Sequence, residues 1–173
     1  MVAQERTEAA EQCLVGIADL VVRPAGSVLL HTHPLGSGMG VAIYDPVAKV
    51  GGLWHAMLPD SSIDARRAQA HPAMFLNTGL AELLKRTNDL DVKKENLLVY
   101  AAGGGRIMDE TGYFNIGAHN HEVLVELLAR QGLKVWAADV GGLANRTMQL
   151  DLRTGEVRLK ISGQPKTRIL CKP

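Results

Sequence analysis

Short apolar runs, each closed by glycine, proline or aspartate, recur along most of the chain and predict strands. The runs are rich in Val, Leu and Ile, as is typical of strands buried in a sheet. The last two flank a turn at 153–155 and predict a hairpin. The expected strands span residues 15–22, 27–33, 41–44, 49–58, 96–102, 133–138, 146–152 and 156–161.

Two segments instead repeat their apolar residues at helical spacing, and each predicts a helix. The first spans 72–86 and begins at Pro72, which a first helical turn accommodates. The second spans 118–131 and is followed by Gly132, where a C-terminal cap glycine belongs. The strands outnumber the helices and come in runs, so we expect an α+β fold with mixed pairing rather than a doubly wound parallel sheet.

The length of the chain fits one domain. We expect an N-terminal arm at 1–12, a single domain at 13–165 and a C-terminal tail at 166–173. Hydrophobic residues make up 46% of the sequence, which is enough for a core that needs neither disulfides nor metals.

Charge and hydropathy exclude several classes of protein. The 19 basic and 18 acidic residues leave a net charge of +1, so the basic excess of a nucleic-acid binder is missing. No apolar stretch approaches the ~20 residues of a membrane span, and the polar, acidic start does not resemble a signal peptide.

Cys13 and Cys171 lie near opposite ends of the chain, and chain termini often lie close together, so a disulfide between them is geometrically possible. The expected protein is nevertheless reduced and cytoplasmic, without membrane insertion.

Two His-x-His pairs raise the question of a metal site. His31 and His33 would share one face of a strand, whereas His119 and His121 would diverge on a helix, and no carboxylate stands at a supporting spacing. We therefore expect no metal. The glycines at 103–105 lack the continuation of a nucleotide-binding loop, and indicate a backbone that needs positive φ or close approach. No cofactor is expected.

Motifs in register over residues 14–161 together resemble the CheD family of chemoreceptor glutamine deamidases. The family's Thr, Gly-Ser-Cys loop and Asp-Pro correspond here to Thr32, the loop ending at Gly38, and Asp45-Pro46. Its His-x-x-Leu-Pro motif corresponds to residues 55–59. The remaining matches are Gly103-Gly104, Asn115-Ile116-Gly117 with Asn120, Asp139-Val-Gly-Gly142 with Arg146, and Thr154-Gly155.

The resemblance implies a fold and a chemistry. The implied fold is an α/β sandwich of mixed β-sheets packed face to face with flanking helices, like that of a cysteine hydrolase. In the implied chemistry, a thiolate attacks the carboxamide of a receptor glutamine, ammonia leaves, and water releases glutamate. By position, His55 would be the base and Thr32 the residue that orients it. Alternation along the strand puts Thr32 on the face opposite His31 and His33.

The resemblance fails at the nucleophile, because Gly38 occupies the position of the catalytic cysteine. Two further departures surround the same site. The family's Tyr-Ala-Asp before the first helix is replaced by Pro72-Ala-Met74, and its aromatic residue after the Gly-Gly turn by Met108. Several changes around one surface favour a sequence released from catalysis.

Three hypotheses follow. The first is a non-catalytic chemotaxis protein that binds the cytoplasmic helices of methyl-accepting chemoreceptors, or a CheC-type CheY-phosphate phosphatase. The second is an active protein-glutamine deamidase, either because the natural chain has cysteine at position 38 or because another nucleophile serves. The third is an unrelated signalling or effector role on the same fold. Ammonia release from receptor peptides separates the first two.

Overall fold

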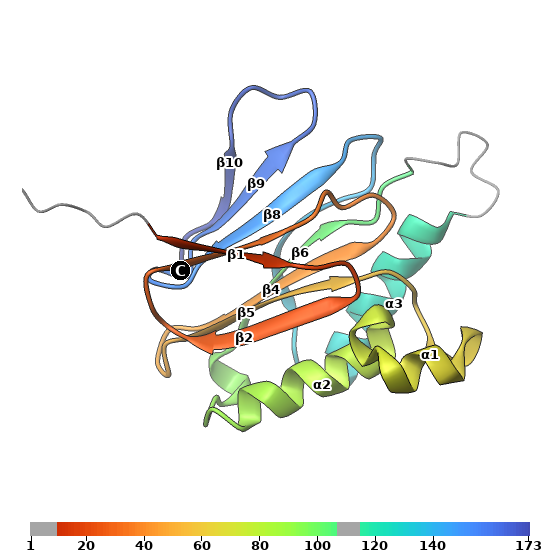
Figure 1. Cartoon of the computed structure of the whole chain (residues 1–173), viewed down its shortest axis with the longest axis horizontal. Helices are drawn as coiled ribbons and strands as arrows, with labels where there is room; N and C mark the ends of the chain where they lie inside the picture. Colours follow the sequence, from red (N-terminus) through yellow and green to blue (C-terminus); the bar gives the residue numbers. More distant parts are fainter. Residues whose placement is uncertain (1–9, 107–114) are drawn as a thin grey trace, which may run out of the picture.

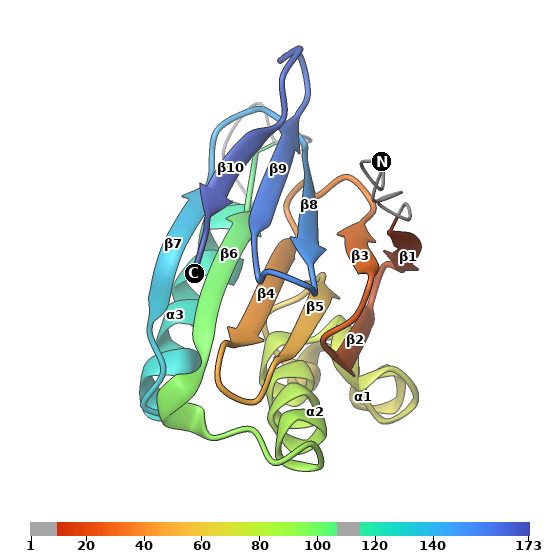
Figure 2. The same ribbon diagram turned by 90° about the vertical axis from the view of Figure 1, so that its left-hand side faces the viewer.

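The computed structural model describes residues 10–106 and 115–173 and has three layers. Two five-stranded sheets pack face to face, and helices cover the outer face of one of them (Figure 1). Figure 2 shows α1, α2 and α3 together on the side of that sheet that faces away from β8, β9 and β10. The α+β class and the sandwich of mixed sheets are thereby confirmed.

The first sheet, sheet A, runs in the spatial order β1-β3-β8-β9-β10. β1 and β3 pair in parallel, and the other neighbours are antiparallel. Its strands are β1 (Glu11–Val15), β3 (Val28–Thr32), β8 (Arg146–Asp151), β9 (Val157–Ile161) and β10 (Arg168–Cys171).

The second sheet, sheet B, runs in the order β2-β5-β4-β6-β7. β6 and β7 are parallel, because α3 carries the chain from one to the other, and the remaining neighbours are antiparallel. Its strands are β2 (Asp19–Pro24), β4 (Met39–Asp45), β5 (Val50–Ala56), β6 (Leu98–Gly103) and β7 (Val135–Val140).

Two long helices seal sheet B. α2 buries Leu80 and Leu83 against it, and α3 buries Leu124 and Leu128. The α-helices are α1 (Ala65–Ala70), α2 (Leu76–Asn88) and α3 (Ile116–Arg130), and the 3-10 helices are η1 (Ser61–Ile63), η2 (Pro72–Met74) and η3 (Lys94–Asn96).

The layers enclose two hydrophobic cores. One lies between sheet B and the helices, with Trp54 fully buried in it, and the other lies between the two sheets. Alternation along β5 divides its side chains between them, so that Trp54 faces the helices while Leu53 faces sheet A. Strands β4 and β5 are buried along their whole length because they have a layer on each face.

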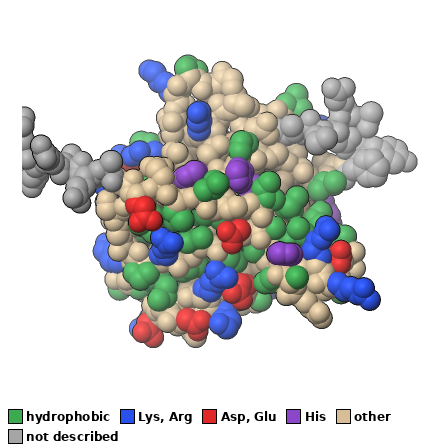
Figure 3. All heavy atoms as spheres, in the orientation of Figure 1, with side chains coloured by type: hydrophobic (Ala, Val, Ile, Leu, Met, Phe, Trp, Pro, Cys, Tyr) green, Lys and Arg blue, Asp and Glu red, His purple; other side chains and the backbone are tan. Residues whose placement is uncertain are grey.

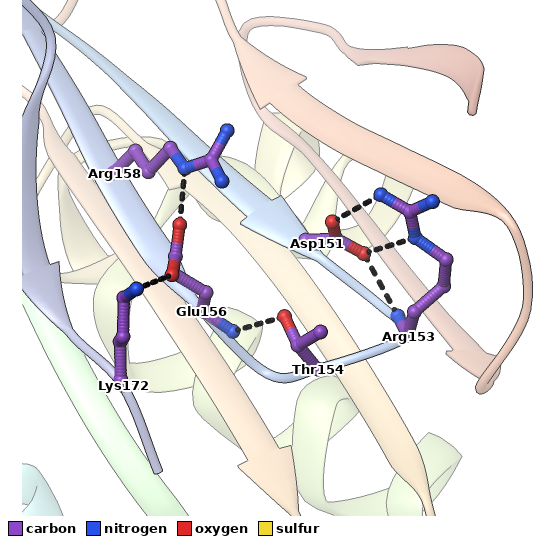
Figure 4. A network of polar contacts seen from close by, with 6 residues as sticks. All are labelled: Asp151, Arg153, Thr154, Glu156, Arg158 and Lys172. Atoms are coloured by element: carbon purple, nitrogen blue, oxygen red, sulfur yellow. Dashed lines mark hydrogen bonds and ion pairs between the residues drawn. The ribbon is translucent and has the colours of Figure 1, made fainter. Parts of the chain in front are cut away.

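Ion pairs lie around the β8–β9 turn, and one of them joins it to the segment after β10 (Figure 4). Glu156, beside β9, contacts Arg158 on the same strand and Lys172 at 3.0 Å, just after β10. Asp151 accepts hydrogen bonds from the Arg153 side chain at 2.7 and 3.0 Å across the β8–β9 turn. The predicted tail at 166–173 thus contains a strand, β10, that the sequence pattern had not indicated. The proposed division into arm, domain and tail stays a prediction.

Two predicted elements are each split in the structure. The single strand expected at 15–22 is wrong, because the chain leaves sheet A after Val15 and joins sheet B at Asp19 through a turn in which Ala18 has φ 59°. The single helix expected at 72–86 is interrupted at Phe75, whose extended backbone forms a bridge with Leu58. The remaining predicted elements are found with small shifts of their ends, and α1 was not predicted.

A disulfide between the two cysteines is excluded by the sheet order. Cys13 on β1 and Cys171 on β10 lie at opposite edges of sheet A. Four strand spacings of about 4.8 Å separate them by about 19 Å, whereas disulfide-bonded residues have Cα atoms within about 7 Å. Both thiols are free.

Candidate functional site

A pocket of about 420 Å³ opens where the loop after β3 meets the end of β5 and the start of α3. Among the described residues, its lining is mostly apolar or backbone, and His55 is the one titratable side chain in that lining. The lining residues are Ile17, Pro34, Gly36, Ser37, Gly38, His55, Met57, Ile116 and Asn145. Two of the three residues singled out from the sequence, Gly38 and His55, therefore share one pocket.

His55 is held in the sheet as a neutral base. It lies near the end of β5, paired with Asp19 on one side and Gly40 on the other, and is 4% exposed. Burial, and to a smaller extent the charge of His33, lower the pKa of His55 from the 6.5 of an exposed imidazole to about 4. Its Nδ1 is buried with no hydrogen-bond partner among the described residues.

Gly38 lies directly against that imidazole. A β-carbon added at Gly38 would lie 3.4 Å from Nε2 of His55, but also only 2.7 Å from the carbonyl oxygen of Ala56. Gly38 is not among the glycines with positive φ, so its backbone conformation is open to other residues. The φ angle at position 38 therefore does not require glycine.

A glycine turn after β6 supports this loop. The N–H of Gly104 donates to the carbonyl of Gly38 at 2.9 Å, and the N–H of Gly105 donates to Gly36 at 2.8 Å. Gly103 has φ 108°, and a β-carbon there would lie 2.3 Å from the Gly38 carbonyl oxygen. The prediction of positive φ or close approach is confirmed for Gly103 and Gly104.

Asn120 on α3 ties the two walls of the pocket together. Its Nδ2 donates to the carbonyls of Ser37 at 3.0 Å and of Met57 at 2.9 Å. The side chain is fully buried, and its Oδ1 has no partner among the described residues. Asn120 thus fixes the loop beside Gly38 against the end of β5 beside His55. The sequence offered Asn120 as part of a motif but did not indicate this function.

Thr32 faces the same interior as His55 but forms no hydrogen bond with its imidazole. It shares the face of Leu30 on β3, as His55 shares that of Leu53 on β5, and both leucines belong to the core between the sheets. The Thr32 hydroxyl accepts from the N–H of Met148 at 3.1 Å and fastens β3 to β8. Thr32 does not line the pocket, so its orienting role stays a prediction.

Exposed apolar side chains surround the mouth of the pocket. Ile17, Met57 and Ile116 are 54%, 37% and 43% exposed, and all three line it. They come from three different segments, so the sequence pattern gave no signal that they would meet. On the face shown in Figure 3, basic and acidic side chains are interspersed with hydrophobic ones and form no field of one sign.

The other candidates from the sequence lie away from this pocket. Cys13 and Cys171 are in sheet A and do not line it. No three His, Cys, Asp or Glu side chains gather as a metal-binding group within residues 10–106 and 115–173. The departure at 72–74 does lie close by, because the Met74 carbonyl accepts from the N–H groups of Met57 and Leu58 at 2.9 and 3.1 Å. Met108 lies outside the described residues.

None of the helices in the described part of the chain is long and apolar enough to cross a membrane.

Comparison with known proteins gives one consistent result. Residues 57–161 match the family model "CheD chemotactic sensory transduction". A probable chemoreceptor glutamine deamidase CheD 1 from Syntrophus aciditrophicus is 41% identical over 152 residues, which is 88% of this chain and 95% of that protein. Two others named probable chemoreceptor glutamine deamidase CheD are each 38% identical. The one from Solibacter usitatus aligns over 94% of this chain and 96% of its own length, and the one from Pyrococcus horikoshii over 84% and 90%. The match to the family model begins just after His55.

Proposed function

This chain belongs to the CheD family, and on that premise we propose that it is a chemotaxis protein that binds chemoreceptors without hydrolysing their glutamine side chains. The observation that carries the proposal is the pairing of Gly38 with His55. Nε2 of His55 lies 3.4 Å from the position that a β-carbon on Gly38 would occupy, and Gly38 itself carries no nucleophilic atom. Without a thiol at that position, the family's thioester route has no attacking atom.

The same pocket keeps the means to hold a carboxamide. Nδ1 of His55 is buried, so the neutral imidazole presents only Nε2 toward Gly38, and this atom can make one hydrogen bond to a ligand. The lowered pKa of His55, about 4, keeps the imidazole neutral at physiological pH. Asn145 lines the same space, and the side chain of asparagine has both a donor and an acceptor. A glutamine side chain can therefore be bound here without being attacked.

The apolar mouth of the pocket suits a helical partner. Ile17, Met57 and Ile116 offer the kind of exposed apolar surface against which the apolar face of an amphipathic helix packs. The relatives are named as chemoreceptor glutamine deamidases, which supports chemoreceptors as the partner. The proposed contact is with their cytoplasmic helices, and the proposed location of the protein is accordingly the cytoplasm.

Binding through this mouth is tested by Ile116→Lys, with Val125→Lys as the matched control. Both side chains are 43% exposed on α3, but Val125 is about 13 Å further along the helix and points the opposite way. Calorimetric titration with a receptor cytoplasmic fragment should show at least about tenfold weaker binding for Ile116→Lys and no change for Val125→Lys. Equal binding by both variants would contradict the proposed docking surface.

A CheC-type CheY-phosphate phosphatase is proposed as a second partner, because in this family that role needs a surface rather than a thiol. Co-purification with such a phosphatase from the same source tests it. A phosphatase that elutes separately at micromolar concentrations of both proteins would contradict this part of the proposal.

The competing function is an active protein-glutamine deamidase. Ser37 favours it, since this residue lines the same pocket as His55. A chain that naturally carries cysteine at position 38 would also be active. Release of ammonia from a receptor fragment, lost in Ser37→Ala, would establish the serine route.

A further inference from the structure

The loop that carries Gly38 turns two of its carbonyl groups toward α3. The carbonyl of Gly36 accepts from the N–H of Gly105 at 2.8 Å. The carbonyl of Ser37 accepts from Nδ2 of Asn120 at 3.0 Å. These two donors lie on one side of the loop, because the glycine turn after β6 packs closely against the first turn of α3. Both carbonyls are thus already engaged within the protein.

Two N–H groups of the same loop face the other way. In a planar trans peptide the N–H points opposite to the C=O, and the described part of the chain contains no cis peptide. The N–H of Ser37 is therefore opposite to the Gly36 carbonyl, and the N–H of Gly38 is opposite to the Ser37 carbonyl. Neither N–H has a hydrogen-bond partner among the described residues. Because all three residues line the pocket beside His55, its wall contains two adjacent unused donors.

His55 contributes a third donor. Its Nδ1 is buried and has no partner among the described residues. A buried N–H without an acceptor is rarer in proteins than a buried acceptor without a donor, so the proton of the neutral ring belongs on Nε2. This nitrogen is the one that faces Gly38. The lowered pKa of His55, about 4, keeps the ring in this neutral, singly protonated state at physiological pH.

Three donors suit a carboxylate better than a carboxamide. A carboxylate accepts hydrogen bonds at both oxygens, whereas the NH₂ group of a carboxamide would meet further donors. Hydrogen bonds to an ionised acceptor are also about twice as strong as neutral ones, and successive backbone N–H groups form anion sites. Asn145, which lines the same pocket, can present the NH₂ end of its side chain. The missing side chain at Gly38 leaves room for a ligand oxygen beside Nε2, where a β-carbon would lie 3.4 Å away.

We propose that this pocket binds the carboxylate of a glutamate side chain in preference to the carboxamide of a glutamine side chain. The inference rests on the proposed function and names the state of the receptor that the chain selects, which is the state that already carries glutamate at the deamidation position. In an active deamidase such selectivity would slow the release of product. In a chain without a nucleophile, it makes receptor binding depend on whether the receptor has been deamidated.

The test uses the full chain and two fluorescent receptor-like helical peptides that differ only in glutamine or glutamate at one position. Dissociation constants are measured by anisotropy at physiological salt. We expect the glutamate peptide to bind at least about fivefold more tightly. A third peptide keeps the glutamine and carries its glutamate on the opposite face of the helix, so that it controls for net charge. It should bind like the glutamine peptide.

The outcomes separate this inference from the proposed function. Equal binding of the glutamine and glutamate peptides, or tighter binding of the glutamine peptide, would overturn the selectivity alone. An equal gain in the third peptide would mean long-range attraction and would also overturn it. Failure of every peptide to bind would overturn the proposed function and this inference with it.

Amide resonances of the full chain identify the donors. In nitrogen-15 NMR spectra, the amide protons of Ser37 and Gly38 should move further downfield with the glutamate peptide than with the glutamine peptide, because hydrogen bonds to a carboxylate are stronger. The amide of Gly132, just beyond the far end of α3, is the control and should not move. A preference for glutamate without these two shifts would overturn the assignment to the loop.

Asn120 tests whether the direction of the loop peptides matters. Asn120→Ala frees the Ser37 carbonyl and with it the peptide that carries the Gly38 N–H. The preference for glutamate should therefore largely disappear, while binding of the glutamine peptide changes little. The exposed Asn88→Ala on α2 is the matched control and should keep the preference. A full preference in Asn120→Ala would contradict the proposed donors.

Discussion

Gly38 and His55 face each other at a distance suited to a nucleophile and its base. A β-carbon on Gly38 would lie 3.4 Å from Nε2, so an atom attached to that carbon would be within reach of the imidazole. The backbone at Gly38 accepts residues other than glycine. The surrounding loop is held by the Gly104 and Gly105 amides, so the arrangement does not depend on a side chain at position 38.

The Gly38→Cys variant tests whether His55 can still activate a thiol at this position. In Gly38→Cys, the new thiol should react with iodoacetamide at pH 7 about tenfold faster than Cys13 or Cys171, because a thiolate beside the imidazole favours its protonated form and opposes the lowering of the His55 pKa by burial. Mass spectrometry of each alkylated peptide gives the three rates. His55→Ala in the Gly38→Cys background should remove the difference.

Gly38→Ala measures the cost of the added β-carbon by itself. The carbonyl of Ala56 would be only 2.7 Å away, so the end of β5 must shift. We expect a loss of about 1–3 kcal/mol in the free energy of unfolding for both Gly38→Ala and Gly38→Cys.

In the reactivity test of Gly38→Cys, a fast-reacting thiol that persists in the His55→Ala background would show that His55 is not the base.

The buried His55 should make the stability depend on pH. The folded chain holds its pKa at about 4, while the unfolded chain binds a proton near 6.5. Between these values the unfolded state carries more protons, so the free energy of unfolding falls as the pH falls from 6.5 to 4, by up to about 3 kcal/mol. Urea titrations across this range measure it. His55→Gln, which cannot titrate, should flatten the slope, and an unchanged slope would contradict the buried, neutral state.

Gly103 should be the glycine of this region that is least tolerant of substitution. Gly103→Ala introduces both a strained φ of 108° and a β-carbon 2.3 Å from the Gly38 carbonyl oxygen. The control is Gly132→Ala, with φ 73° and nothing within 4 Å of the added carbon. We expect thermal unfolding to give a loss of about 1 kcal/mol for the control and at least about 3 kcal/mol for Gly103→Ala. Similar losses of stability in Gly103→Ala and Gly132→Ala would show that the close approach between Gly103 and Gly38 adds nothing to the cost of the substitution.

Asn120 should control the order of the loop beside Gly38. Asn120→Ala removes the hydrogen bonds to the carbonyls of Ser37 and Met57, at about 0.5–1.5 kcal/mol each. Hydrogen exchange at the Gly104 and Gly105 amides, which donate to the same loop, should become faster. The exposed Asn88→Ala on α2 is the control and should leave both measurements unchanged.

Local patterns predicted most of the fold. Runs of apolar residues gave β3, β5, β6, β8 and β9, because each is flanked by turn residues and buries one or both faces. The turn at Ala18 was missed since a non-glycine residue with φ 59° leaves no local signal. The extended Phe75 was missed because its bridge to Leu58 is a tertiary contact that overrides helical spacing.

The site was only partly accessible from the sequence. Its motif positions led to Gly38 and His55, which the structure brings together. The contacts of Asn120 and the apolar mouth depend on segments that are distant in the sequence, so no local pattern indicated them. The absence of a hydrogen bond between Thr32 and His55 is likewise a matter of side-chain placement in three dimensions.

The most direct test of the account is to incubate the unaltered chain with a receptor cytoplasmic fragment and count glutamine-to-glutamate conversions by mass spectrometry. Loss of a triad nucleophile lowers the rate on the order of 10⁶-fold, and the remaining groups leave ~10³-fold over water. We therefore predict that the fragment binds and that its conversion stays on the order of 10⁶-fold below an enzyme-like rate. Conversion at an enzyme-like rate that disappears in His55→Ala would contradict the claim that this chain binds without catalysing.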